Sequence, residues 1–152
     1  MTLPFGDSVE TSSWSLGDLA RVLLTIPLLL TLPVVLTVVV MSRTRASLLW
    51  FSNHGSRFVP GDPTPHRVVS AVKVADDRLP VSRSCLVRSL TAETMLQLYA
   101  FEPNHKIGVT TESTDSITAH SWLEYRGEVL IGDVDDLDRY EPLPSIDDTD
   151  EL

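Results

Sequence analysis

Residues 82–133 contain the stretch that decides the fold. They open with Ser82-Arg83-Ser84-Cys85-Leu86, continue through Ala119-His120-Ser121-Trp122-Leu123-Glu124 and close with Gly132-Asp133. The first segment predicts a helix that begins at the cysteine and runs to about Phe101, and the other two predict neighbouring β-strands. A thiol at a helix start and a histidine on a strand are the parts that thiol nucleophiles require, so we expect this stretch to carry the function.

The cysteine is expected in the first turn of its helix, because Ser82 or Ser84 can act as the N-cap. Unpaired amides and the helix dipole favour a thiolate there, and Arg83 and Arg88 add positive charge nearby. Cys85 could instead begin an inert core stripe, because free cysteines are often buried. The other members of that stripe would be Ser89, Ala92, Leu96 and Tyr99.

The strands are predicted at residues 105–111, 117–125 and 128–133. If Arg126 and Gly127 form a two-residue turn, Tyr125 pairs with Glu128, Leu123 with Leu130, Trp122 with Ile131, and His120 with Asp133. Opposed side chains lie about 4.5–5.5 Å apart at Cβ, so Asp133 would orient His120 toward Cys85. Asp135 is the second choice, and a turn longer by one residue would bring Val134 to His120.

Alternation places Trp122 and Glu124 on the face of His120, where Trp122 would shield the site or pack on the cysteine helix. Cys85 is the only cysteine, which excludes an intrachain disulfide. The remaining histidines show no ligand spacing, so we expect no metal and no cofactor. The net charge of −9 also makes nucleic acid an improbable partner.

The N-terminal part contains an uncharged apolar run at residues 22–42, bounded by Arg21 and Arg43. This run is long enough to cross a bilayer, and Pro27 and Pro33 are tolerated in membrane helices. The arginines that follow it predict a single span with the catalytic domain in the cytoplasm. The alternative is a cytoplasmic protein whose apolar helix packs on a partner or on the catalytic domain.

The expected organisation is therefore a polar tail (1–16), a hydrophobic helix with a juxtamembrane segment (17–58), a catalytic domain (66–143) and an acidic tail (144–152). A helix over residues 66–79 opens the catalytic domain and ends before Pro80. The expected fold class is α+β, with the cysteine-bearing helix packed on an antiparallel sheet. The order Cys, His, Asp is that of papain-like and transglutaminase-like thiol enzymes.

These segments resemble the leader peptidases of lasso-peptide biosynthesis, which are transglutaminase-like cysteine proteases. The resemblance rests on Cys85-Leu86 at a helix start, on Ile107-Gly108-Val109, and on the strand 119–124 with Gly127 after it. It extends to the closing segment 139–143. The sequence departs from the family's pattern at Val81, where tryptophan is common, and at Ser121, where alanine is. Many members also place the acidic residue one position closer to the histidine.

The resemblance implies a protease that removes the leader from a ribosomally made precursor peptide, using Cys85, His120 and Asp133. It implies two partners, a separate leader-binding protein and an ATP-dependent macrolactam cyclase. One alternative is another acyl transfer on the same triad, such as cross-linking or deamidation. The other is a non-catalytic membrane adaptor with this fold.

Overall fold

The structure is a computed structural model that describes residues 14–39, 41–55, 61–113 and 116–144. Most of the expected polar tail, residues 56–60 and nearly all of the acidic tail lie outside the described residues. Within them the chain forms four α-helices, a short 3₁₀ helix and one antiparallel sheet. The elements are α1 (Leu16–Val38), α2 (Met41–Gly55), α3 (Pro65–Arg78), α4 (Cys85–Leu98), β1 (Asn104–Ser113), β2 (Ser116–Tyr125), β3 (Glu128–Ile131), η1 (Leu137–Arg139) and β4 (Glu141–Pro142).

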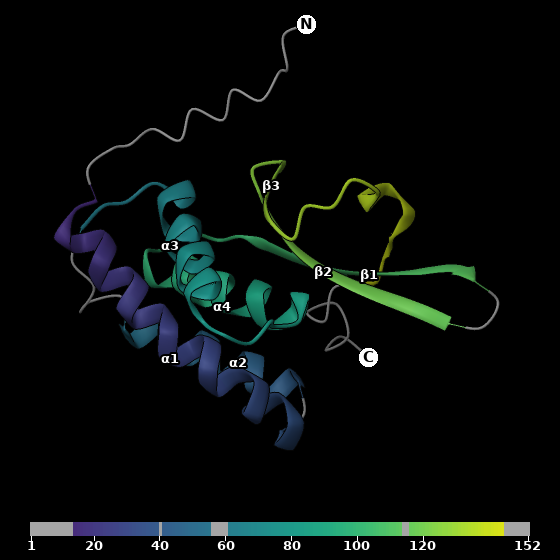
Figure 1. Cartoon of the computed structure of the whole chain (residues 1–152), viewed down its shortest axis with the longest axis horizontal. Helices are drawn as coiled ribbons and strands as arrows, with labels where there is room; N and C mark the ends of the chain where they lie inside the picture. Colours follow the sequence, from purple (N-terminus) through teal and green to yellow (C-terminus); the bar gives the residue numbers. More distant parts are fainter. Residues whose placement is uncertain (1–13, 40, 56–60, 114–115, 145–152) are drawn as a thin grey trace, which may run out of the picture.

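Helix α4 is the centre of the fold, because it packs on the sheet and also contacts α1, α2 and α3 (Figure 1). Every residue from Ser89 to Leu96 is buried. The alternative considered for Cys85 was a single core-facing stripe, but a helix enclosed by other helices and a sheet is buried all round. Its packing on the sheet confirms the α+β prediction.

The two predicted helix starts of this region are capped by side chains. The hydroxyl of Ser84 accepts a hydrogen bond from the Val87 amide at 3.3 Å, so Cys85 is the first residue of α4. Thr64 caps α3 in the same way, and α3 ends just before Leu79 and Pro80, as predicted. Helix α4 stops at Leu98, earlier than the predicted Phe101.

The sheet has the strand order β3-β2-β1-β4. Arg126 and Gly127 both have positive φ, 52° and 84°, which confirms the predicted two-residue turn between β2 and β3. Strand β4 pairs with β1 and was not predicted, because two residues carry no periodicity. It returns the chain to the edge of the sheet beside the predicted site.

The predicted register between β2 and β3 is correct only next to the turn. Tyr125 pairs with Glu128 as expected, but Leu123 pairs with Ile131, and the predicted Leu123–Leu130 and Trp122–Ile131 pairs are wrong. The reason is a β-bulge, in which β3 uses one more residue than β2. Since β3 ends at Ile131, the ladder does not extend to His120 and Asp133.

Helix α1 packs on the domain that follows it in the sequence. Leu29 and Leu32 are buried in a cluster with residues of α3 and α4, so the packing alternative considered for this helix is the arrangement seen. The uncharged run 22–42 does not form one helix, because α1 ends at Val38 and α2 begins at Met41. The domain core therefore includes part of α1.

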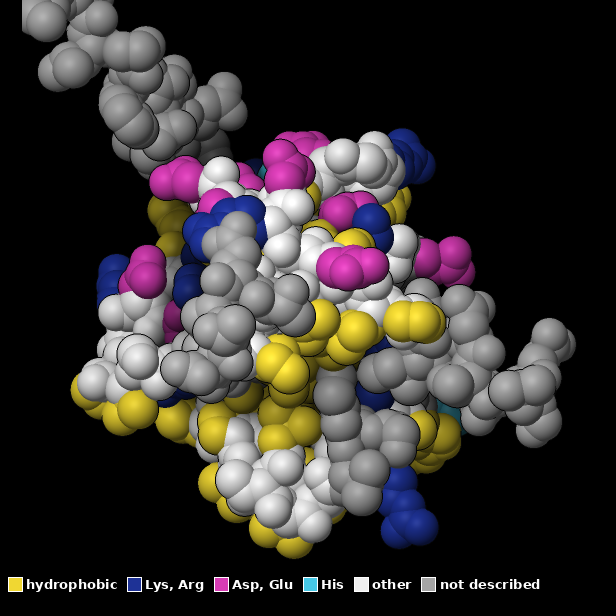
Figure 2. All heavy atoms as spheres, turned by 90° about the vertical axis from the view of Figure 1, so that its right-hand side faces the viewer, with side chains coloured by type: hydrophobic (Ala, Val, Ile, Leu, Met, Phe, Trp, Pro, Cys, Tyr) yellow, Lys and Arg dark blue, Asp and Glu magenta, His cyan; other side chains and the backbone are white. Residues whose placement is uncertain are grey.

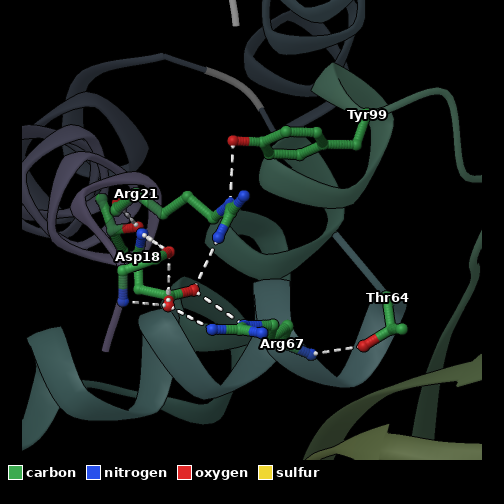
Figure 3. A network of polar contacts seen from close by, with 7 residues as sticks. Asp18, Arg21, Thr64, Arg67 and Tyr99 are labelled. Atoms are coloured by element: carbon green, nitrogen blue, oxygen red, sulfur yellow. Dashed lines mark hydrogen bonds and ion pairs between the residues drawn. The ribbon is translucent and has the colours of Figure 1, made fainter. Parts of the chain in front are cut away.

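A polar network fastens the start of α1 (Figure 3). The carboxylate of Asp18 accepts hydrogen bonds from Arg67 of α3 at 3.0 and 2.6 Å and from Arg21 at 2.6 Å. Arg21 also donates to the Tyr99 hydroxyl at 3.1 Å, at the end of α4. One turn of α1 is thus joined to both helices that carry the domain core.

The opposite side of α1 is apolar and exposed. Its exposed residues include Leu19, Leu23, Leu30 and Val34. On the face of the molecule shown in Figure 2, hydrophobic side chains gather in the lower part and acidic ones in the upper part. Trp50 and Phe51 of α2 are also exposed.

Candidate active site

Cys85 lies half-buried at the first position of α4, where the sequence placed it. The backbone amides of Cys85 and Leu86 make no hydrogen bond within the described part of the chain, as is usual in a first helical turn. These amides and the helix dipole make the surroundings of Sγ favourable for negative charge.

His120 is held by a backbone carbonyl. Its Nε2 donates to the oxygen of Gly132 at 2.6 Å, since a carbonyl can only accept. Nε2 therefore carries a proton, and in the neutral ring Nδ1 has the lone pair. The ring is stacked near Trp122 at 6.1 Å between centroids and faces Tyr140 at 5.2 Å.

The aromatic residues around His120 depend on Gly108 of β1, which pairs with His120. A Cβ at Gly108 would lie 2.9 Å from the ring of Trp122 and 2.9 Å from Tyr140. The glycine of the Ile-Gly-Val segment thus leaves room for both aromatic side chains. Trp122 is held in turn, because its Nε1 donates to Glu124 at 2.9 Å.

Glu124 also pairs with Lys106 on β1 at 2.8 Å. The hydrogen bond from Lys106 lowers the pKa of Glu124 below its usual range, so the carboxylate stays ionised and accepts from the indole. The expected shared face of His120, Trp122 and Glu124 is confirmed, and Trp122 packs beside the histidine.

Asp133 is exposed and follows Gly132 directly. Among the described residues it makes no hydrogen bond or ion pair, and the hydrogen bond that His120 does make goes to the Gly132 carbonyl. Asp135, the second choice, is exposed farther along the same loop. The carboxylates therefore do not make the orienting contact in this structure.

A pocket of about 270 Å³ brings the three predicted residues together. It lies at the end of β3, and its lining includes Cys85, His120 and Asp133. No hydrogen bond joins Cys85 to His120 within the described residues. The shared pocket is small for a drug-sized ligand but accommodates one reacting group of a peptide. The remaining lining residues are Lys73, Arg88, Ser89, Val129, Leu130, Ile131, Gly132 and Val134.

A buried polar chain lies on the other face of β2. His105 Nδ1 is 2.8 Å from Glu93, and its Nε2 is 2.7 Å from the hydroxyl of Ser121. Arg45 of α2 pairs with the second oxygen of Glu93 at 3.1 Å. Burial would raise the pKa of Glu93, but its contacts with His105 and Arg45 lower it overall.

The Glu93–His105–Ser121 geometry is that of a hydrolytic triad, but all three residues are largely shut off from solvent. The side chains of His105 and Glu93 are only 3% and 4% exposed, and Ser121 is 2% exposed. A substrate cannot reach this hydroxyl, so the role of these three residues is structural. Their hydrogen bonds join β2 to α4. Ser89 adds a second connection between α4 and β2, because its hydroxyl donates to the Ser121 carbonyl at 3.0 Å.

Sequence reasoning missed Gly132, Tyr140 and Lys73 as parts of the site. Gly132 left a signal: it follows a strand and precedes an acidic residue, where a positive φ is common. Its φ is 84°, and a Cβ would lie 2.6 Å from the Ser121 carbonyl oxygen. Tyr140 and Lys73 left none, since both reach the site from other elements. No group of three metal-ligating side chains occurs in the described ranges.

Comparison with known proteins gives one result. A family model described as transglutaminase-like superfamily matches residues 28–145, which includes α4, the sheet and the second half of α1. No curated protein and no solved structure matches the chain significantly.

Proposed function

Because this chain belongs to the transglutaminase-like superfamily, we propose that it is a cysteine peptidase with Cys85 as nucleophile and His120 as general base. The observation that carries the proposal is the single pocket that Cys85, His120 and Asp133 share at the start of α4. Asp133 contributes negative charge that stabilises the imidazolium, while the Gly132 carbonyl orients the ring.

In the proposed reaction, His120 Nδ1 takes the proton of the Cys85 thiol, and Sγ attacks the carbonyl carbon of the scissile amide. The oxygen gains negative charge and meets the free amides of Cys85 and Leu86, each donor being worth about 2.7–4 kcal/mol in related acyl transfers. Collapse expels the amine, which takes the proton from His120. Water, deprotonated by His120, then hydrolyses the thioester and restores the thiol.

We propose that the substrate is a ribosomally made lasso-type precursor peptide, from which the enzyme removes the leader. The support is the set of matching segments: Cys85-Leu86, residues 107–109 and residues 119–124. The structure adds a physical reason for the second one, since Gly108 makes room for the side chains beside His120. A leader-binding protein and an ATP-dependent cyclase are the partners that this substrate implies.

We also propose that α1 holds the protein at a membrane, with the catalytic domain on the cytoplasmic side. The support is that α1 is long and apolar enough to span a bilayer and exposes an apolar outer face. Its inner face is joined to α3 through Asp18 and Arg67. We propose that α1 lies along the membrane surface with its outer face among the lipids, because this arrangement keeps the ion pair between Asp18 and Arg67.

The test is to search the neighbouring reading frames for a short precursor peptide and a leader-binding protein, to incubate the full chain with them and to weigh the products. We expect two fragments whose summed mass is the precursor plus one water, and no fragments with Cys85→Ala. A mass that shows cross-linking or deamidation would identify another acyl transfer. An intact precursor with the wild-type chain would contradict catalysis and favour the adaptor role.

A further inference from the structure

Helix α1 contains a carbonyl that its own helix cannot satisfy. In an α-helix the amide of residue 33 would donate to the carbonyl of residue 29, but Pro33 has no N–H. Leu29 is fully buried, with 0% exposure. An unpaired carbonyl in such a place is costly, so a donor from elsewhere in the fold is needed.

The donor is Arg83, which lies in the loop just before Cys85. Its Nε is 3.3 Å from the Leu29 oxygen, and its Nη1 donates to Asp76 of α3 at 3.3 Å and to the Val81 carbonyl. The side chain is only 5% exposed. One guanidinium thus joins α1, α3 and the loop that leads into α4.

The same carboxylate connects this arginine to the candidate active site. The second oxygen of Asp76 forms an ion pair with Arg88 Nε at 2.9 Å. Arg88 lies in the first turns of α4 and lines the pocket with Cys85. Contacts from Arg83 and Arg88 therefore hold the chain on both sides of the cysteine.

We propose that Arg83 is a positioning residue that fixes the first turn of α4, and with it Cys85, by anchoring to the Leu29 carbonyl that Pro33 leaves free. This rests on the proposed function, in which Cys85 is the nucleophile. Since the Arg83 side chain is only 5% exposed and is tied to protein groups, we expect its effect on the reaction rate. Helix α1 is then part of the catalytic apparatus in addition to any membrane role.

The first experiment measures the alkylation rate of the full chain by iodoacetamide at neutral pH. Cys85 is the only cysteine, so every alkylation event reports on it and no substrate is needed. We expect Arg83→Met to slow alkylation roughly twofold to fivefold, the size of a helix-terminal charge effect. Arg78→Met, which removes an exposed arginine of α3, is the matched control and should leave the rate unchanged. Equal rates for the two variants would overturn the proposal.

A second pair of variants covers the case in which Arg83→Met does not fold. Pro33→Ala restores an amide that competes for the Leu29 carbonyl, and it favours helix formation. Pro27→Ala makes the same change in the same helix, but its new amide donates to the carbonyl of Leu23, on the exposed side. We expect Pro33→Ala to slow alkylation and Pro27→Ala to leave it unchanged. If both variants behave alike, the Leu29 anchor is wrong.

Peptide cleavage separates this proposal from the proposed function. With an active wild type, Arg83→Met should lower kcat and leave KM nearly unchanged, and Arg83→Lys should recover part of kcat. A rise in KM alone would contradict a positioning role. If the wild type cleaves nothing but Pro33→Ala, which removes no charge, still slows alkylation and Pro27→Ala does not, the positioning of Cys85 holds and the peptidase assignment fails.

Discussion

His120 donates from Nε2 to the carbonyl oxygen of Gly132 at 2.6 Å, and this bond does what a carboxylate does in most catalytic triads. It selects the tautomer and leaves Nδ1 to exchange protons. A backbone carbonyl carries no full charge, however, so it orients the imidazolium without neutralising it. In the proposed mechanism, the role left for Asp133 is electrostatic.

Replacing Asp133 with asparagine should therefore cost only about tenfold or less in kcat. The orientation of His120 is kept by Gly132, and only charge stabilisation of the imidazolium is lost. In a triad whose aspartate sets the tautomer, the same change costs about 10⁴-fold. Steady-state cleavage of the precursor distinguishes the small loss of kcat from the large one, with Asp135→Asn as the control. A loss near 10⁴ would mean that Asp133 replaces the carbonyl as partner of His120 during the reaction.

Gly132→Ala should destabilise the fold more than Gly127→Ala. Both glycines have a φ of 84°, and the left-handed conformation costs alanine about 1–2 kcal/mol. At Gly127 no atom lies within 4 Å of the added Cβ, whereas at Gly132 backbone atoms of β2 lie within 2.8 Å. Denaturant unfolding of the two variants measures the difference. Equal losses would show that the chain around Gly132 can move at no cost.

The buried Glu93 should make stability depend on pH in the acid range. Its folded-state pKa lies below the usual value of 4.5, so its contribution is complete above that pH and is lost as the pH falls through the folded value. We expect Glu93→Gln to lower the free energy of unfolding by about 3–5 kcal/mol near neutrality, because Arg45 and His105 lose their charged partner.

The measurement for Glu93 is the urea midpoint from about pH 6 to about pH 3. The wild-type midpoint should fall over this interval, and Glu93→Gln should fall less steeply. Glu102→Gln, which changes an exposed glutamate, should keep the wild-type slope. A Glu93→Gln variant with the full wild-type slope would place the acid sensitivity in other carboxylates.

The exposed face of α1 should bind lipid. Burial of one leucine side chain is worth about 1.5–3 kcal/mol, so replacing Leu23 and Leu30 together with glutamine should lower vesicle binding by more than about tenfold. The assay is flotation with neutral phosphatidylcholine vesicles, because a chain of net charge −9 is repelled by anionic ones. Ile117→Gln removes an apolar residue of β2 that is more exposed than either leucine and is the control. Wild-type protein that stays at the bottom of the gradient would refute membrane association.

Local features of this protein could be predicted because they depend on residues close in the sequence. Ser84 caps α4 through the amide of Val87, and Pro80 ends α3, whose C-cap is the adjacent Leu79. The turn at Arg126 and Gly127 likewise needs only its own two residues. These features place Cys85 at a helix start and His120 on a hairpin strand.

The β-bulge in β3 marks where prediction from the sequence failed. Pairs predicted from the turn outward are correct only while both strands contribute one residue to each pair. One extra residue in either strand shifts every later pair. The predicted meeting of His120 with Asp133 depended on that extrapolation. The partner that the fold supplies, Gly132, has no side chain for a motif to reveal.

The sequence by itself therefore determined the helix that bears Cys85, the strand that bears His120 and the turn between β2 and β3. Only the tertiary structure decided that Arg83 donates to the carbonyl of Leu29, 54 positions away. The same holds for the contact between Glu93 of α4 and His105 of β1. The physical reason is that capping and turn formation depend on residues only a few positions apart in the sequence. Buried polar groups, by contrast, take whichever partner the packing of distant elements brings within reach.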